Sequence, residues 1–141
     1  MPITPIQATG TLPPAGHYSQ AVVHNGLVYL SGQLPIDLAT GRRCTGSIEE
    51  QTEQVLQNVR LVLEAAGSSL DRLLKVTVYV ADVEYWSAVN AVYARVLGDH
   101  RPARAVVPTG PLHHGFLIEV EAIAATVGSC RPPQPRVGNL G

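Results

Sequence analysis

An arginine and a glutamate near the end of the chain are the residues whose types and spacing could support chemistry. Arg104 lies in the otherwise apolar run 102–107, and Glu119 lies fifteen residues later in the apolar run 116–124. A guanidinium on a strand is costly to bury unless an anion pairs with it. That anion is either Glu119 or the carboxylate of a bound small molecule. In the second alternative Arg104 would be a substrate-binding residue.

Two further polar positions interrupt apolar patterns. Side chains alternate along a strand, so Glu119 and Glu121 share one face of theirs. Two such carboxylates repel each other unless one of them meets a cation or water. The face is either an ordinary surface, paired with Lys75, Arg104 or solvent, or a place where Glu119 holds a water molecule or a substrate proton. Asn90 lies in the apolar stripe of a helix and must be hydrogen-bonded, either to a loop carbonyl or as part of a pocket.

Length and charge exclude several classes of function. The chain has 141 residues, a net charge of -1 at pH 7 and 45% hydrophobic residues, which is typical of one compact domain. Because the charge is nearly neutral, neither nucleic acid nor a membrane surface is an expected partner. No apolar run is long enough to span a membrane, and the N-terminus lacks the basic and apolar segments of a signal peptide. These features predict a cytoplasmic protein.

Metal and thiol chemistry are not predicted. Cys44 and Cys130 are isolated, without the spacing of a zinc site or a disulfide framework. The neighbouring His113 and His114 have no recognisable third ligand, so a loop contact or a pocket rim is favoured over a metal site. The motifs of phosphate-binding loops, serine hydrolases and zinc proteases are also missing from the sequence.

Turn and capping signals predict the elements that must position these residues. Strands are expected at 21–24 and 27–32, joined by a tight turn at Asn25-Gly26, and residues 34–38 can extend this sheet. Ser47 and Glu50 match a capping box that opens a helix, and Gly67 ends it.

The second half of the domain is expected to alternate strands with one helix. Strands are predicted at 74–80, 103–107 and 116–127, and the helix runs from its cap at Asp82 to Leu97. The predicted buried stripe of this helix comprises Trp86, Val89, Asn90, Tyr93, Val96 and Leu97.

The chain is expected to have one folded domain between two irregular ends. Residues 1–16 are predicted to be an irregular arm, residues 17–127 the folded domain, and residues 128–141 a mobile tail rich in proline and glycine. The order β-β-α-β-α-β-β indicates an α+β fold, in which a mixed sheet carries two helices on one face. The strands have apolar side chains on both faces, so self-association is the simplest cover for the second face.

Seven short motifs follow one another in register along the domain. They are His17-Tyr-Ser-Gln-Ala21, Leu30-Ser-Gly-Gln-Leu-Pro35, Asn58 with Glu64-Ala-Ala-Gly67, Lys75-Val-Thr-Val-Tyr-Val80 with Asp82, Val89-Asn-Ala-Val-Tyr93, Pro102-Ala-Arg104 and Ile118-Glu-Val-Glu-Ala-Ile-Ala124. Together they resemble the RidA/YjgF family of enamine and imine deaminases, from about Tyr18 to Ala124. This resemblance implies a chorismate-mutase-like subunit in a homotrimer, with clefts at the subunit interfaces.

The resemblance also implies roles for individual residues. Arg104 would bind the carboxylate of a 2-imino acid, and Glu119 would position the attacking water. Tyr18 would transfer a proton or hold the product carbonyl. The other positions expected to contact the substrate are Ser31, Gly32 and Asn90. The family reaction implies neither a cofactor nor a metal.

The sequence departs from the family pattern at three places. Val106 replaces a common cysteine, His17 replaces a proline, and the segment 108–114 lacks a usual glutamate. The resemblance therefore leaves open a general deaminase of 2-aminoacrylate-type imines and a pathway-specific one, for instance for 2-aminomuconate. A trimer that binds 2-oxo acids without turnover is another alternative. A ribonuclease or translation inhibitor is disfavoured by the missing basic stripe.

Overall fold

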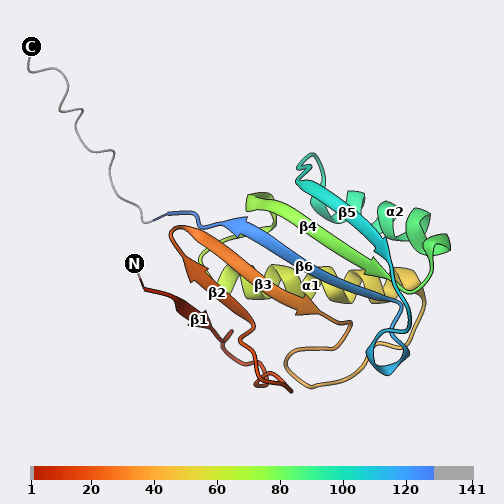
Figure 1. Cartoon of the computed structure of the whole chain (residues 1–141), viewed down its shortest axis with the longest axis horizontal. Coiled ribbons are helices and arrows are strands. Elements are labelled where there is room, and N and C mark those ends of the chain that lie inside the picture. Colours follow the sequence, from red (N-terminus) through yellow and green to blue (C-terminus); the bar gives the residue numbers. More distant parts are fainter. Residues whose placement is uncertain (1, 129–141) are drawn as a thin grey trace, which may run out of the picture.

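The computed structural model describes residues 2–128 and confirms the predicted α+β fold class (Figure 1). The elements, in chain order, are β1 (Thr4–Ile6), β2 (Ala21–His24), β3 (Leu27–Gln33), α1 (Ile48–Ala65), η1 (Leu70–Arg72), β4 (Leu73–Val80), η2 (Val83–Tyr85), α2 (Trp86–Leu97), β5 (Ala103–Pro108), η3 (His113–Gly115) and β6 (Ile118–Ala125). The 6-stranded sheet has the order β1-β2-β3-β6-β4-β5. Strands β4 and β5 are parallel and all other pairs are antiparallel. Figure 1 shows both helices behind the sheet.

Local signals in the sequence account for the main elements. Asn25 and Gly26 have φ angles of 51° and 77°, the pair of positive values that a type I′ hairpin turn requires. The Ser47 hydroxyl accepts a hydrogen bond from the Glu50 amide at 3.2 Å and caps α1. The Asp82 carboxylate accepts one from the Glu84 amide at 2.9 Å, so the short helix η2 begins there and leads directly into α2. The predicted hairpin and the two predicted caps are therefore confirmed.

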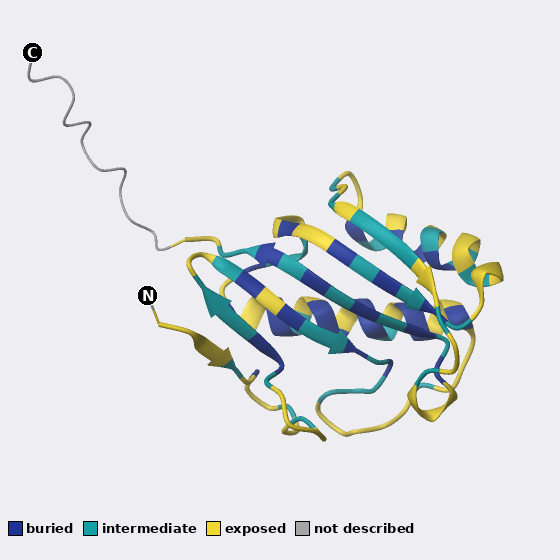
Figure 2. Ribbon diagram, viewed as in Figure 1, coloured by how far each residue is buried: buried dark blue, intermediate teal, exposed yellow. Residues whose placement is uncertain are grey.

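The core lies between the sheet and the two helices. Along β6 the residues alternate strictly between buried and half-buried, as the banding of the strands in Figure 2 shows. The buried side chains of this strand are Ile118, Val120, Ala122 and Ala124. They pack with apolar side chains of the other strands and of both helices, among them Val28, Val55, Val59, Val62, Val76, Val78 and Val89.

The N-terminal arm is more ordered than predicted. Residues 4–6 form the edge strand β1, in which Thr4 pairs with Val23 and Ile6 with Ala21. The Gln20 side chain accepts a hydrogen bond from the Ala8 amide at 2.8 Å, and this buried contact continues the attachment. A three-residue strand that contains a proline is too short to show an alternation of apolar and polar side chains, so no strand was predicted there.

Two other predictions about elements were wrong. Residues 34–38 form no strand, because only the isolated bridge between Ile36 and Arg43 occurs there. Trp86 is 44% exposed at the start of α2 rather than part of the buried stripe. Trp86 is the first residue of α2, and the buried positions of this helix are Val89, Val92, Tyr93 and Leu97.

The second face of the sheet carries side chains that no described element covers. Tyr29 is 44% exposed on β3, and Thr77, Tyr79, Glu121 and Ile123 are half-buried on β4 and β6. We call this the open face. Self-association through it stays a prediction. The predicted mobile tail lies outside the described residues, apart from Gly128. Among residues 2–128 no helix is long and apolar enough to cross a membrane.

Candidate active site

Glu119 projects from β6 on the open face, beside a gap left by a glycine. The pairing of β3 with β6 shifts between Leu30 and Gln33, so Ser31 and Gly32 form an irregularity in the sheet. A Cβ atom at Gly32 would lie 3.1 Å from the Glu119 carboxyl carbon and closer still to Oε2. The missing side chain at Gly32 therefore makes the space that the Glu119 carboxylate occupies.

The electrostatic surroundings of Glu119 favour its protonated form. Partial burial raises the pKa of the Glu119 carboxyl, the nearby charge of Glu121 raises it further, and His113 opposes both by lowering it. Glu121 differs, because its Oε1 accepts a hydrogen bond from the Tyr79 hydroxyl at 2.5 Å. Within residues 2–128 no side chain or amide donates a hydrogen bond to Glu119. One carboxylate of the pair is thus held by a tyrosine, and the other is free to bind water or a ligand.

Arg104 lies on the opposite face of the sheet. It is in register with Val76, whose side chain is buried under the helices. The Arg104 Nη1 atom donates a hydrogen bond to Oδ1 of Asn90 at 3.0 Å, and its guanidinium carbon lies 4.7 Å from the centre of the Tyr93 ring. Asn90 and Tyr93 are three residues apart on α2 and therefore hold the guanidinium from one side of that helix.

The pairing of Arg104 with Glu119, one of the two alternatives, does not occur. The two residues point to opposite faces of the sheet, and the ion pair found in the described part of the chain joins Arg95 to Glu53. Arg104 keeps donors that neither Asn90 nor Tyr93 uses. Tyr93 was predicted only as a member of the buried stripe of its helix. Its spacing from Asn90 on the same helix was the signal that could have found it.

Tyr18 and Ser31 lie on the same side of the molecule as Gly32. The Ser31 hydroxyl donates a hydrogen bond to the Ser19 carbonyl at 2.6 Å, and the Ser31 amide donates one to the Gln20 carbonyl at 3.0 Å. These bonds hold the segment that carries Tyr18, whose side chain is 54% exposed. Tyr18 and Gly32 line one cavity of about 280 Å³.

The six predicted site residues therefore form two groups in one chain. One group contains Glu119 and the three residues Tyr18, Ser31 and Gly32, and the other contains Arg104 and Asn90. The site roles of these residues stay predictions, and the sequence could not show that the sheet separates the two groups.

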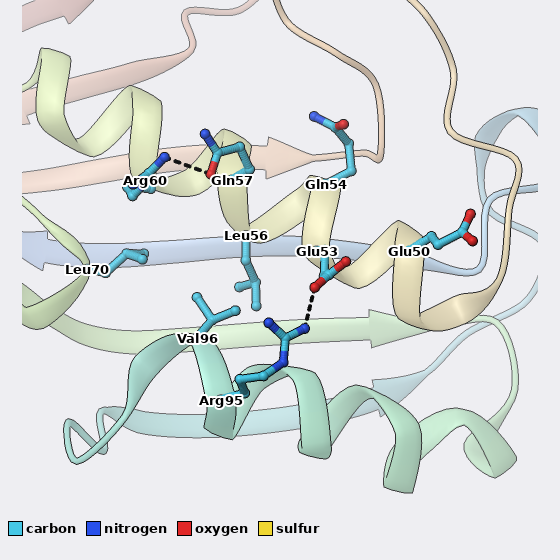
Figure 3. A pocket seen from close by; sticks show the side chains of 9 residues that line it. All are labelled: Glu50, Glu53, Gln54, Leu56, Gln57, Arg60, Leu70, Arg95 and Val96. Carbon is cyan, nitrogen blue, oxygen red and sulfur yellow. Dashed lines mark hydrogen bonds and ion pairs between the residues drawn. The ribbon is translucent and has the colours of Figure 1, made fainter.

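A larger hollow, of about 540 Å³, lies elsewhere, between α1 and α2 (Figure 3). Three of its four charged side chains already have partners, because Arg95 pairs with Glu53 and Arg60 donates a hydrogen bond to the Gln57 side chain at 2.8 Å. None of the predicted site residues lines it. In residues 2–128 there is also no group of three or more potential metal ligands, and His113 and His114 have ring centres 6.0 Å apart.

Comparison with known proteins identifies the family. The sequence model of a family described as "Endoribonuclease L-PSP" matches residues 9–126, most of the chain. A RutC family protein of Pyrococcus horikoshii is 46% identical over 111 residues, which are 79% of this chain and 88% of the relative. The chain belongs to the RidA/YjgF family.

Other relatives of this RidA/YjgF protein have a named activity or a solved structure. The 2-iminobutanoate/2-iminopropanoate deaminase of Capra hircus is 41% identical over 120 residues, covering 84% of this chain and 88% of the relative. The crystal structure of RidA from an Antarctic Psychrobacter is similar with a TM-score of 0.81 and 36% identity, over 86% of this chain and 98% of the other. The fold and the family are thus shown by the likeness of both sequence and structure to these proteins.

Proposed function

We propose that this protein hydrolyses 2-imino acids, formed from enamines such as 2-aminoacrylate, to 2-oxo acids and ammonia. The observation that carries the proposal is the unpartnered Glu119 carboxylate, partly buried beside Gly32 and with a raised pKa. An arginine with unused donors, Arg104, is available for the substrate carboxylate. The named deaminase activity of a relative 41% identical supports the same reaction.

The two groups of residues would act on one substrate if two copies of the chain meet. No side-chain rotation brings Arg104 and Glu119 of one subunit together, because the sheet lies between them. Arg104 is on the edge strand β5, and Glu119 is on the open face, so both remain accessible to a neighbouring subunit. We propose that Arg104 and Asn90 of one copy face Glu119, Tyr18, Ser31 and Gly32 of another. In a homotrimer, each cleft between two subunits would then be lined by Arg104 and Asn90 of one copy and by the other four residues of its neighbour.

In this arrangement the reaction needs positioning rather than a covalent intermediate. The guanidinium of Arg104 binds the substrate carboxylate through two parallel hydrogen bonds, which fixes the imine carbon. Glu119 takes a proton from water as the oxygen attacks that carbon, an effect of about 10²–10⁴ in rate. The electrons of the C=N π bond pass to nitrogen, which receives the proton held by Glu119, so the first product is a carbinolamine. The hydroxyl proton is then transferred to nitrogen as the C–N bond breaks, ammonia leaves, and the C=O bond of the 2-oxo acid forms. Tyr18 is placed to pass that proton or to hold the carbonyl oxygen.

The first experiment measures imine hydrolysis with and without the proposed residues. An amino-acid oxidase generates the imine, and semicarbazide traps whatever survives, so a deaminase lowers the semicarbazone yield. We expect the wild-type protein to lower it, and Arg104→Ala and Glu119→Gln to lose most of this effect. If wild type leaves the yield unchanged for several imines, deamination of free 2-imino acids is refuted. Binding of 2-oxo acids by that inactive protein would then support a non-catalytic binding role.

Mixing the two inactive variants tests the interface. Arg104→Ala and Glu119→Gln subunits, exchanged at equal ratio, would form wild-type sites at about one quarter of the interfaces by random assortment. Activity should recover to roughly that level, since each intact site takes Arg104 from one copy and Glu119 from another. No recovery after verified subunit exchange would refute a site shared between copies.

The same samples can be incubated with RNA to test the ribonuclease alternative. The net charge of -1 predicts no salt-sensitive binding of RNA.

A further inference from the structure

The reaction just described uses only Tyr18 and Gly32 of the residues that line the cavity of about 280 Å³, and the rest of its wall has no assigned role. Its walls come from the segment 12–15, the end of β3, the loop 36–43 and His114. The Leu12 amide donates a hydrogen bond to the Leu38 carbonyl at 2.8 Å, which fixes the N-terminal segment against that loop. The volume approaches the lower end of small-molecule sites, about 300 Å³, and exceeds what a three-carbon imine would need.

This cavity adjoins the position of Glu119 at Gly32. Gly32 lines the cavity and also lies directly against the Glu119 carboxylate. Tyr18 lines it as well, with more than half of its side chain exposed. A substrate whose reacting carbon lies near Glu119 therefore has room for a longer side chain on the side of this cavity.

The charged groups around the cavity differ in whether they are already engaged. The Asp37 carboxylate accepts hydrogen bonds from the amides of Ala39 at 2.9 Å and Thr40 at 3.0 Å, and these bonds lower the pKa of Asp37. Arg43 lines the cavity, and its guanidinium makes no hydrogen bond or ion pair with any of residues 2–128. The acidic group is thus satisfied by backbone, whereas the cationic group is available to a ligand.

His114 contributes a second donor at the rim. Its backbone has φ 57° and ψ 19°, a left-handed conformation that is uncommon outside glycine and asparagine. Its ring packs edge-on against Phe116, which is buried, with centroids 5.8 Å apart. The turn and this contact together hold the imidazole at the wall of the cavity.

We propose that this cavity is a side-chain subsite that selects elongated 2-imino acids with a second anionic group, bound by Arg43 and His114. The inference rests on the proposed function for the location of the reacting carbon. A distal carboxylate would accept hydrogen bonds from the Arg43 guanidinium and the His114 ring, while the apolar walls at Leu12, Leu34 and Leu38 would contact the methylene groups between the two acids.

The test compares two 2-oxo acids of five carbons by calorimetry, so that it does not depend on turnover. 2-Oxoglutarate has the distal carboxylate and 2-oxopentanoate lacks it. We expect wild type to bind 2-oxoglutarate about tenfold more tightly, the effect of one charge-assisted hydrogen bond. Arg43→Gln should reduce this ratio to about twofold or less, and His114→Gly, which the left-handed backbone tolerates, should reduce it in part. Arg42→Gln is the matched control, because Arg42 is the adjacent arginine and does not line the cavity.

Failure of the subsite and failure of the deaminase are distinguishable. Equal affinity for the two acids in wild type, or an unchanged ratio in Arg43→Gln, refutes the subsite whether or not imines are hydrolysed. A ratio that falls equally in Arg42→Gln also refutes it, because a general charge effect then explains the preference. A specific loss in Arg43→Gln supports the subsite even if imine hydrolysis is absent.

Discussion

Replacing Gly32 by alanine should inactivate the protein without unfolding it. The added Cβ would lie 3.1 Å from the Glu119 carboxyl carbon and closer to Oε2, whereas ordinary contacts begin at 3.4 Å. The backbone at Gly32 has no positive φ, so alanine is allowed there and only the flexible end of Glu119 must yield. Because Oε2 is the closest atom, the carboxylate must move by about 1 Å. A displacement of that size at a catalytic group costs about 10²-fold in rate.

The assay is the semicarbazide competition, with kcat/KM measured for Gly32→Ala and for Gly110→Ala. Gly110 is the matched control, since an added Cβ there meets nothing within 4 Å. We expect kcat/KM of Gly32→Ala to fall by about 10²-fold and that of Gly110→Ala to stay near wild type. Thermal melting should show both variants folded. Wild-type activity in a folded Gly32→Ala protein would refute the claim that this glycine sets the position of the Glu119 carboxylate.

Three further predictions concern the charges of the site. Asn90→Ala removes the hydrogen bond that orients Arg104, so we expect KM to rise about tenfold, and Asn90→Asp, which retains an acceptor, to rescue part of it. Since Glu119 acts as a carboxylate and its pKa is raised, activity should fall as pH drops through that pKa. Glu121→Gln should move this acid limb of the rate profile to lower pH and His113→Asn should move it to higher pH, and limbs that stay in place would contradict the assignment. The raised pKa also means that the folded state disfavours the charged form, so Glu119→Gln should raise the melting temperature at pH 7, with the gain vanishing below pH about 4.

Much of the fold could be predicted because its signals are local. The turn at Asn25-Gly26, the cap at Ser47 and the alternation along β6 each depend on neighbouring residues, and the structure confirms all three. The strand β1 and the exposure of Trp86 were missed because they depend on pairing and on where the helix begins rather than on local pattern. A three-residue strand gains its stability from the neighbouring strand, and Trp86 is the first residue of α2, at the end of the stripe that Val89, Tyr93 and Leu97 continue.

The candidate site shows a similar division. Residue types alone indicated Arg104, Glu119 and Asn90, since each interrupts an apolar pattern. The face on which Arg104 lies was not predictable, because it follows from the register of β5 on β4 and not from the composition of either strand. The space at Gly32 was equally hidden, as it depends on a side chain more than eighty residues away in the sequence.

The two edge strands of the sheet limit how copies of this protein can meet. Strand β1 has Pro5 at its centre, and strand β5 ends at Pro108. A proline offers no amide hydrogen, so Pro5 interrupts the row of donors at the outer edge of β1, whereas Pro108 only ends the row along β5. The β1 edge is therefore a poor template for a further strand, and the β5 edge, which carries Arg104, is the one with a continuous run of residues to offer. Growth of the sheet strand by strand is thus disfavoured at one of its two edges.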